Sequence, residues 1–134
     1  MPILLSIKPR FARAILAGTK RFEFRRRGFA ATPDHVAIYS TSPEQQIIGW
    51  FDVERVIEDT PEALWERCGH AGGIEREEFM AYYEGCTTGF AIEIGDTESL
   101  GTPISLSDLP VPVTAPQSYR NLDDTLWNEI ASHR

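Results

Sequence analysis

The chain has 134 residues, of which 42% are hydrophobic and 25% charged, with a formal net charge of −7 at pH 7. The chain is also rich in aromatic and β-branched residues, which excludes an intrinsically disordered chain. No window approaches the roughly 20 consecutive apolar residues of a membrane-spanning helix, and the first residues do not form a secretory signal. We therefore expect a cytoplasmic protein with one domain, residues 1–134, and no membrane partner.

The first part of the chain predicts a strand, a helix and a second strand. Residues 3–7 are short, apolar and partly β-branched, as in a buried strand. Pro9 suits the first turn of a helix and Gly18 suits its end, so residues 9–17 are expected to be helical. Residues 22–25 then alternate between phenylalanine and polar residues, which predicts a strand with the phenylalanines facing the core.

The rest of the chain contains further strand patterns and two helical regions. A helical insertion is expected at about 60–85, because a Thr-Pro pair opens it and a glycine closes it. Gly49 marks a bulge or a close backbone approach within a strand. Apolar patterns predict strands at 35–41, 46–59 and 88–96, a further edge strand at 102–109, and a C-terminal tail helix at about 123–132.

The order of these elements predicts an α+β fold. Strands cluster together, and the regular strand–helix alternation of a doubly wound parallel sheet is missing. A small, mostly antiparallel β-barrel is the natural way to close several such strands. We therefore expect a small β-barrel with a helix after its first strand and a helical insertion.

Most of the positive charge lies in residues 8–27, which hold eight of the thirteen basic residues and one acid, Glu23. Such a run is often only a solvated surface. Here, however, Lys20 lies at a tight helix-to-strand junction, and Glu23 and Arg25 project from the same face of a strand. Lys8 ends the first strand just before the helix, which brings it near Lys20 across the same junction.

These four side chains form a candidate site for a phosphate-bearing ligand. Arg25 can bind phosphate with a planar fork, and Lys20 supplies a point charge. Glu23 can hold one cation in place or act as an acid or base. The acidity of the whole chain does not forbid nucleic-acid binding, because affinity for phosphate depends on the local patch.

Two other segments offer candidate ligand contacts. In "APQSYR", Tyr119 can stack on a base, Gln117 can bond to its edge, and Arg120 follows them in a proline-bounded turn. Tyr39 and Ser40 follow a predicted strand and can line the same cleft. The alternative for each is a structural role, such as packing against the barrel. No motif has the spacing of a metal site, an organic cofactor site or a hydrolase triad, so we expect none of these.

The stretch "GTKRFEFR" matches the pattern Gly-x-Lys-x-x-Glu-x-Arg that marks ASCH domains, members of the PUA-like superfamily. The opening "LLSIKP", the segment "IIGWFDVERVIEDTPEALW" and "APQSYR" also resemble small prokaryotic and phage ASCH proteins. The resemblance runs from Ile3 to about Arg120. It implies a PUA-like β-barrel with a cleft beside the first helix.

The resemblance also implies a link to RNA. ASCH domains are proposed to bind RNA, often as coregulators of transcription or translation, and some members cleave single-stranded RNA. Another branch hydrolyses the amide of an acetylated cytidine with a lysine, a threonine and a glutamate. That lysine corresponds to Lys20, the threonine falls where this chain has Glu23, and the glutamate has no assigned counterpart.

Three functional hypotheses follow. The first is a module that binds single-stranded RNA or a nucleotide through Lys8, Lys20 and Arg25, and so regulates transcription, translation or RNA metabolism. The second is a small ribonuclease or modified-nucleoside amidohydrolase, in which burial and nearby arginines lower the pKa of Lys20 and Glu23 shuttles a proton. The third is a protein-interaction domain that works through its acidic surface. The sequence predicts no oligomeric state.

Overall fold

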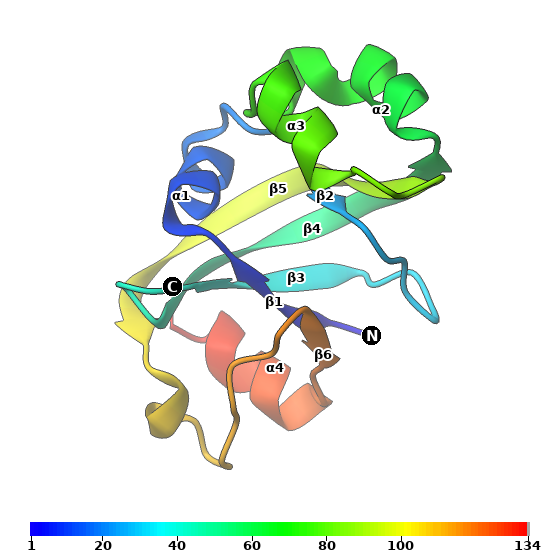
Figure 1. Ribbon diagram of the computed structural model, residues 1–134. Coiled ribbons are helices and arrows are strands. Elements are labelled where there is room, and N and C mark those ends of the chain that lie inside the picture. Colours follow the sequence, from blue (N-terminus) through cyan, green and yellow to red (C-terminus); the bar gives the residue numbers. More distant parts are fainter. Residues whose placement is uncertain (134) are drawn as a thin grey trace.

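The computed structural model describes residues 1–133, which form one curled six-stranded sheet, four α-helices and two short 3₁₀ helices (Figure 1). The strands are β1 (Ile3–Ile7), β2 (Phe22–Arg25), β3 (His35–Ser40), β4 (Gln46–Asp59), β5 (Gly89–Ile104) and β6 (Tyr119–Asn121). Their order in the sheet is β2-β5-β4-β3-β1-β6. All neighbours are antiparallel except β1 and β3. The expected α+β class and the mostly antiparallel, barrel-like sheet are confirmed, and the sheet curls into a half-barrel.

The helices begin and end at the residues that local sequence signals favour. They are α1 (Pro9–Ala17), α2 (Pro61–Cys68), α3 (Arg76–Tyr82) and α4 (Asp124–Ala131), with 3₁₀ helices η1 (Gly69–Ala71) and η2 (Leu106–Asp108). Gly18 ends α1 with φ +84°, a conformation that glycine adopts without strain. Asp123 caps α4 by accepting a hydrogen bond from the Leu126 amide at 2.8 Å. Across residues 1–133, every helix is too short or too polar to cross a lipid bilayer.

Both faces of the sheet are covered, so β1 is buried on both sides. α1, α2 and α3 lie over one face and α4 over the other (Figure 1). Ile3, Leu5 and Ile7 belong to the core cluster beneath α1, whereas Leu4 belongs to the cluster beneath α4. Alternate residues of a strand point to opposite faces. This explains why every residue of β1 except Ser6 is apolar.

A third core cluster lies between the β2–β5 edge and the helical insertion. Phe24 of β2 packs edge-on against Phe79 of α3, with ring centroids 4.9 Å apart. Leu64 of α2 and Ala91 of β5 are completely buried in the same cluster. The insertion is therefore anchored to β2, the strand that carries the charged motif.

Two predictions of local structure were wrong. The separate edge strand expected at 102–109 does not form, because β5 continues to Ile104 against β4 and then turns into η2. The expected turn containing Tyr119 and Arg120 is instead strand β6, paired with β1. An open edge of β1 would leave backbone groups unpaired, and β6 supplies their partners. Neither pairing is visible in the local sequence pattern.

Candidate functional site

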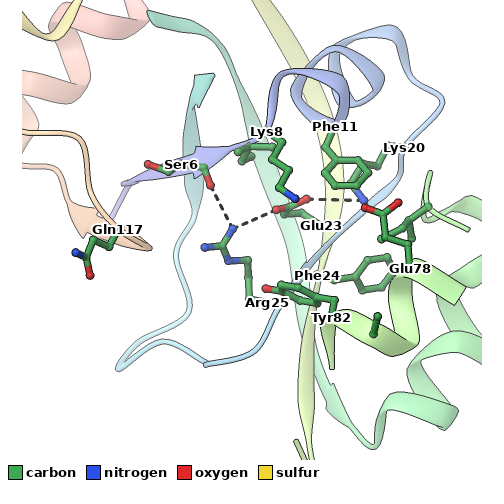
Figure 2. A pocket seen from close by; sticks show the side chains of 13 residues that line it. Ser6, Lys8, Phe11, Lys20, Glu23, Phe24, Arg25, Glu78, Tyr82 and Gln117 are labelled. Atoms are coloured by element: carbon green, nitrogen blue, oxygen red, sulfur yellow. Dashed lines mark hydrogen bonds and ion pairs between the residues drawn. The ribbon is translucent and has the colours of Figure 1, made fainter. Parts of the chain in front are cut away.

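A cavity of about 560 Å³ opens between α1, the end of β1, β2 and α3. Figure 2 shows its charged side chains converging from these elements. Its lining contains both ionic and aromatic groups. The lining residues are Ser6, Ile7, Lys8, Phe11, Lys20, Glu23, Phe24, Arg25, Ile74, Glu78, Ala81, Tyr82 and Gln117.

Lys20 lies at the inner end of this cavity and is only 1% exposed. Its Nζ donates to the Gly72 carbonyl at 2.5 Å and lies 3.8 Å from Glu23 Oε1. The same atom lies 4.7 Å from the ring centroid of Phe11 and 4.9 Å from that of Phe24. Burial lowers the pKa of Lys20, and the neighbouring Glu23 opposes this shift without cancelling it. Lys20 can therefore release its proton more readily than a surface lysine.

The loop after η1 covers the stem of Lys20 at very close range. A Cβ atom placed on Gly73 would lie 2.9 Å from the Lys20 Cβ, and Gly73 has φ +64°. Only glycine tolerates both the approach and the backbone angle. The glycine pair at 72–73 thus places a carbonyl on Lys20 Nζ and closes the inner end of the cavity.

Glu23 lies between two cations and is 5% exposed. Its Oε2 accepts a hydrogen bond from Arg25 Nη1 at 3.3 Å, opposite the Lys20 ammonium. Arg25 also donates to the Ser6 carbonyl and to Ser118 Oγ, each at 3.3 Å. A buried carboxylate is tolerated when it is paired and hydrogen-bonded in this way. The Arg25 guanidinium is thus held between the Ser6 carbonyl and Glu23 (Figure 2).

The rim of the cavity joins α1 to α3. Arg10 of α1 forms an ion pair with Glu78 of α3. Tyr82, one helical turn beyond Glu78, keeps 36% of its surface exposed, and burial of the remainder raises the pKa of its hydroxyl. Lys8 is exposed beside them. The rim therefore offers a cation and an aromatic surface to a ligand.

The structure brings five of the predicted site residues to this cavity and places four elsewhere. Lys8, Lys20, Glu23, Arg25 and Gln117 line it. The other four predicted residues do not line the cavity, contrary to expectation. Those four are Tyr39, Ser40, Tyr119 and Arg120.

Strand geometry explains these corrections. Tyr39 faces α4 and is 6% exposed within the core cluster there, and Ser40 is completely buried. Tyr119 packs edge-on against Phe29 at 4.9 Å between centroids, which covers the ring expected to stack on a base. Arg120 lies in β6 opposite Leu4, outside the cavity lining. Successive side chains of a strand point to opposite faces of the sheet, and the sequence pattern did not show which face each of these residues would take.

Sequence reasoning also missed several residues of the cavity. Phe11, Glu78 and Tyr82 line the cavity but are not among the predicted site residues. Glu78 and Tyr82 are four residues apart, a spacing that places them on one face of a helix. That spacing was readable in the sequence, but their approach to Lys20 depends on how α3 docks against β2.

The family model for the ASCH domain matches residues 5–97, more than half of the chain. This chain belongs to the ASCH domain family. The matched region includes Lys20, Glu23 and Arg25 and ends within β5. Strand β6 and helix α4 lie beyond it.

A curated relative of this ASCH protein is the "ASCH domain-containing ribonuclease" of Zymomonas mobilis subsp. mobilis. It is 32% identical over 107 residues, which cover 79% of this chain and 72% of the relative. The crystal structure of ASCH from Zymomonas mobilis superimposes with a TM-score of 0.89 at 29% identity, covering 98% of this chain and 94% of that one. The N-terminal domain of Staphylothermus marinus McrB matches with a TM-score of 0.63 at 9% identity, which shows a shared fold alone.

The geometry of the ASCH site supports anion binding and proton transfer. Arg25 and Lys8 present donors to the cavity, and the buried pair of Lys20 and Glu23 can exchange a proton. Within residues 1–133, no group of three or more histidine, cysteine or acidic side chains is placed to hold a metal ion.

Proposed function

We propose that this ASCH protein binds single-stranded RNA, with one nucleotide held in the cavity between α1 and α3. The observation that carries the proposal is the gathering of Lys8, Lys20 and Arg25 around one cavity in a chain of net charge −7. A cavity of about 560 Å³ falls within the roughly 300–1,000 Å³ range of small-ligand sites. Arg25 takes the phosphate, and the exposed ring of Tyr82 stacks on the base.

The curated relative strengthens RNA as the ligand class, because the Zymomonas protein is named a ribonuclease. Single-stranded RNA also suits the site better than a duplex. Its unstacked bases can enter a cavity, whereas a duplex presents its backbone and grooves.

Binding of fluorescently labelled single-stranded RNA, measured by anisotropy, tests this proposal. We expect affinity to fall steeply between ~50 and ~200 mM salt, as for other phosphate-driven complexes. Arg25→Gln should weaken binding at least about tenfold, since it removes a charge-assisted contact. Arg76→Gln is the matched control, because Arg76 is an exposed arginine of α3 paired with Glu62 and outside the cavity. Absence of binding by the wild type at ~50 mM salt would refute the proposal.

A second candidate function is RNA cleavage, favoured by the proximity of Lys20 and Glu23. Glu23 takes the proton of a 2′-hydroxyl, whose oxygen attacks the adjacent phosphorus while the bond from phosphorus to the 5′-oxygen breaks. The Lys20 ammonium gives a proton to that leaving 5′-oxygen. Proton return from Glu23 to Lys20 across their 3.8 Å separation restores both groups. The lowered pKa of Lys20 suits it to the role of acid.

Cleavage is tested with Lys20→Met, which keeps a long, unbranched side chain but removes the amine that carries the proton. We expect wild-type protein to release products with a 2′,3′-cyclic phosphate and to leave 2′-deoxy substrates intact. Lys20→Met should lose at least about a hundredfold in rate, in the range typical of general acid–base groups. Unchanged cleavage by this variant would remove Lys20 from the chemistry. A parallel panel of acylated nucleosides tests the amidohydrolase alternative.

A further inference from the structure

A second cavity of about 570 Å³ adjoins the first on the side of the chain that follows β2. The two cavities share Arg25, Tyr82 and Gln117 as a common wall. The floor and rim of the second are formed by Arg26 and Arg27 together with Cys86 and Ser118. A strand of RNA leaving the first cavity over this wall would enter the second.

Two arginines of this second cavity, Arg26 and Arg27, have no carboxylate partner in the part of the chain that the structure describes, whereas Arg25 pairs with Glu23. Arg26 Nε donates to the Cys86 Sγ at 3.4 Å. Arg10, Arg13, Arg55, Arg67 and Arg76 each pair with a carboxylate. Within residues 1–133, neither of the two arginines that follow Arg25 has a carboxylate oxygen within 4.0 Å. The chain carries twenty acidic residues, so this positive charge is left unneutralised despite an abundance of possible partners. An external anion is the partner that such a cluster can take.

The backbone that carries these arginines is held in place from both ends. The Tyr83 hydroxyl lies within hydrogen-bonding distance of the Arg25 carbonyl, at 3.1 Å, and of the Phe90 carbonyl, at 3.2 Å. Gly28 packs so closely on Phe90 that an added Cβ would lie 2.6 Å from the ring. The segment is therefore presented on a fixed frame, which lowers the cost of ordering it around a ligand.

We propose that the second cavity is a separate phosphate subsite, in which Arg26 and Arg27 bind the backbone phosphate of the nucleotide next to the one in the first cavity. The proposal rests on the RNA-binding function proposed above and narrows its ligand. The ligand is a strand of at least two nucleotides rather than a free nucleoside or mononucleotide. Arg25 and Tyr82 form the ridge over which the strand passes between the two cavities.

The test compares ligands of increasing length that cannot be cleaved through a 2′-hydroxyl. The probes are 2′-fluoro uridine 5′-monophosphate and 5′-phosphorylated 2′-fluoro oligouridines of two and four nucleotides, so that each added nucleotide adds one phosphate, and all are titrated by calorimetry. The double variant R26Q/R27Q removes two positive charges from the second cavity. The double variant R67Q/R76Q removes the same charge from exposed, acid-paired arginines that line neither cavity.

We expect the wild type to bind the dinucleotide at least about tenfold more tightly than the mononucleotide, the gain of one charge-assisted phosphate contact. R26Q/R27Q should bind the mononucleotide with the affinity of the wild type. It should not show the higher affinity of the wild type for the dinucleotide. Its slope of log affinity against log salt for the tetranucleotide should fall by about 0.7, the value for one lost phosphate contact on a single strand. R67Q/R76Q should keep the gain and the slope.

The outcomes separate this inference from the proposed function. Wild-type protein that binds the mononucleotide but gains nothing with length would overturn the second subsite and leave the first cavity standing. Equal weakening of every ligand by R26Q/R27Q and by R67Q/R76Q would also overturn it, because the effect would then be one of net charge. Failure of the wild type to bind any of the probes would overturn both proposals together.

Discussion

The face of the sheet beneath α4 and the face beneath α1 and α3 differ in the side chains that they bury. Under α4, Leu4, Leu122, Leu126 and Ile130 are all at most 2% exposed and contact one another. Under α1 and α3, the buried set includes Lys20 and a cavity is left open. One face is a closed apolar core, and the other combines an apolar core with a cavity lined by charged side chains.

The two faces differ in how burial contributes to the stability of the fold. Burial of apolar area is favourable wherever it occurs, without selecting a ligand. A buried ion pair, by contrast, is often no more stable than apolar residues of the same volume. Under the proposed function, the buried pair of Lys20 and Glu23 serves ligand chemistry rather than stability. Four predictions test this contrast.

The largest effect is expected beneath α4. Leu126→Ala should lower the free energy of unfolding by about 2–5 kcal/mol, because it removes buried methyl groups and leaves a space in the core. Urea denaturation measures the loss. RNA affinity of the folded variant should stay unchanged, since α4 contributes nothing to the cavity. A loss of affinity in fully folded protein would mean that the two faces are coupled.

A smaller effect is expected from Glu23→Gln in the cavity. The variant keeps the shape of the side chain but removes the negative charge between Lys20 and Arg25. We expect a loss of about 1–3 kcal/mol in unfolding free energy, the cost of leaving buried groups imperfectly paired. Thermal and urea unfolding measure it, with the exposed Glu62→Gln as the control. Stability equal to or above that of the wild type would show that this ion pair is not part of what stabilises the fold.

The third prediction concerns pH. The pKa of Lys20 is lowered in the folded protein from its usual 10.5, so the unfolded chain binds more protons between the two values. Unfolding free energy should therefore rise with pH in the window from the lowered pKa up to 10.5, with a slope of at most about 1.4 kcal/mol per pH unit.

Lys20→Met removes this titration, so the difference in stability between wild type and variant should grow in favour of the wild type as pH rises. Urea titrations at a series of pH values from neutral to alkaline measure that difference. A pH-independent difference would mean that Lys20 titrates normally in the folded state.

The smallest effect is expected at the exposed ion pair between Arg76 and Glu62. Arg76→Gln should change the unfolding free energy by no more than about 1 kcal/mol, because water screens such a pair and both side chains regain freedom when it breaks. The same titrations measure it. A larger loss would disqualify this variant as a control for Arg25→Gln.

Much of the fold could be predicted because its signals are local. The strand at 3–7, the helix at 9–17 and the strand at 22–25 have the predicted bounds. Gly49 was expected at a bulge or close approach, and the β4–β5 register does shift there, with the Glu98 carbonyl 2.6 Å from an added Cβ. Periodicity, proline and glycine act over a few residues, so they can be read from the chain.

The errors share one cause, which is pairing between distant segments. Continuation of β5 to Ile104 depends on β4, and β6 forms only because β1 offers an edge. Tyr39 was expected in the cleft, but its position along β3 turns it toward α4. The partner that decides each of these outcomes lies far along the chain.

The sequence by itself determined that Lys20, Glu23 and Arg25 would come together after a short helix, because a glycine turn and the two-residue period of a strand are local properties. Tertiary structure alone decided that Lys20 is buried, since the carbonyl above it belongs to Gly72, fifty-two residues away. It also brought Tyr82 to the same cavity. Burial and pKa depend on everything that surrounds a side chain, and most of those surroundings come from segments that are neighbours only in the folded chain.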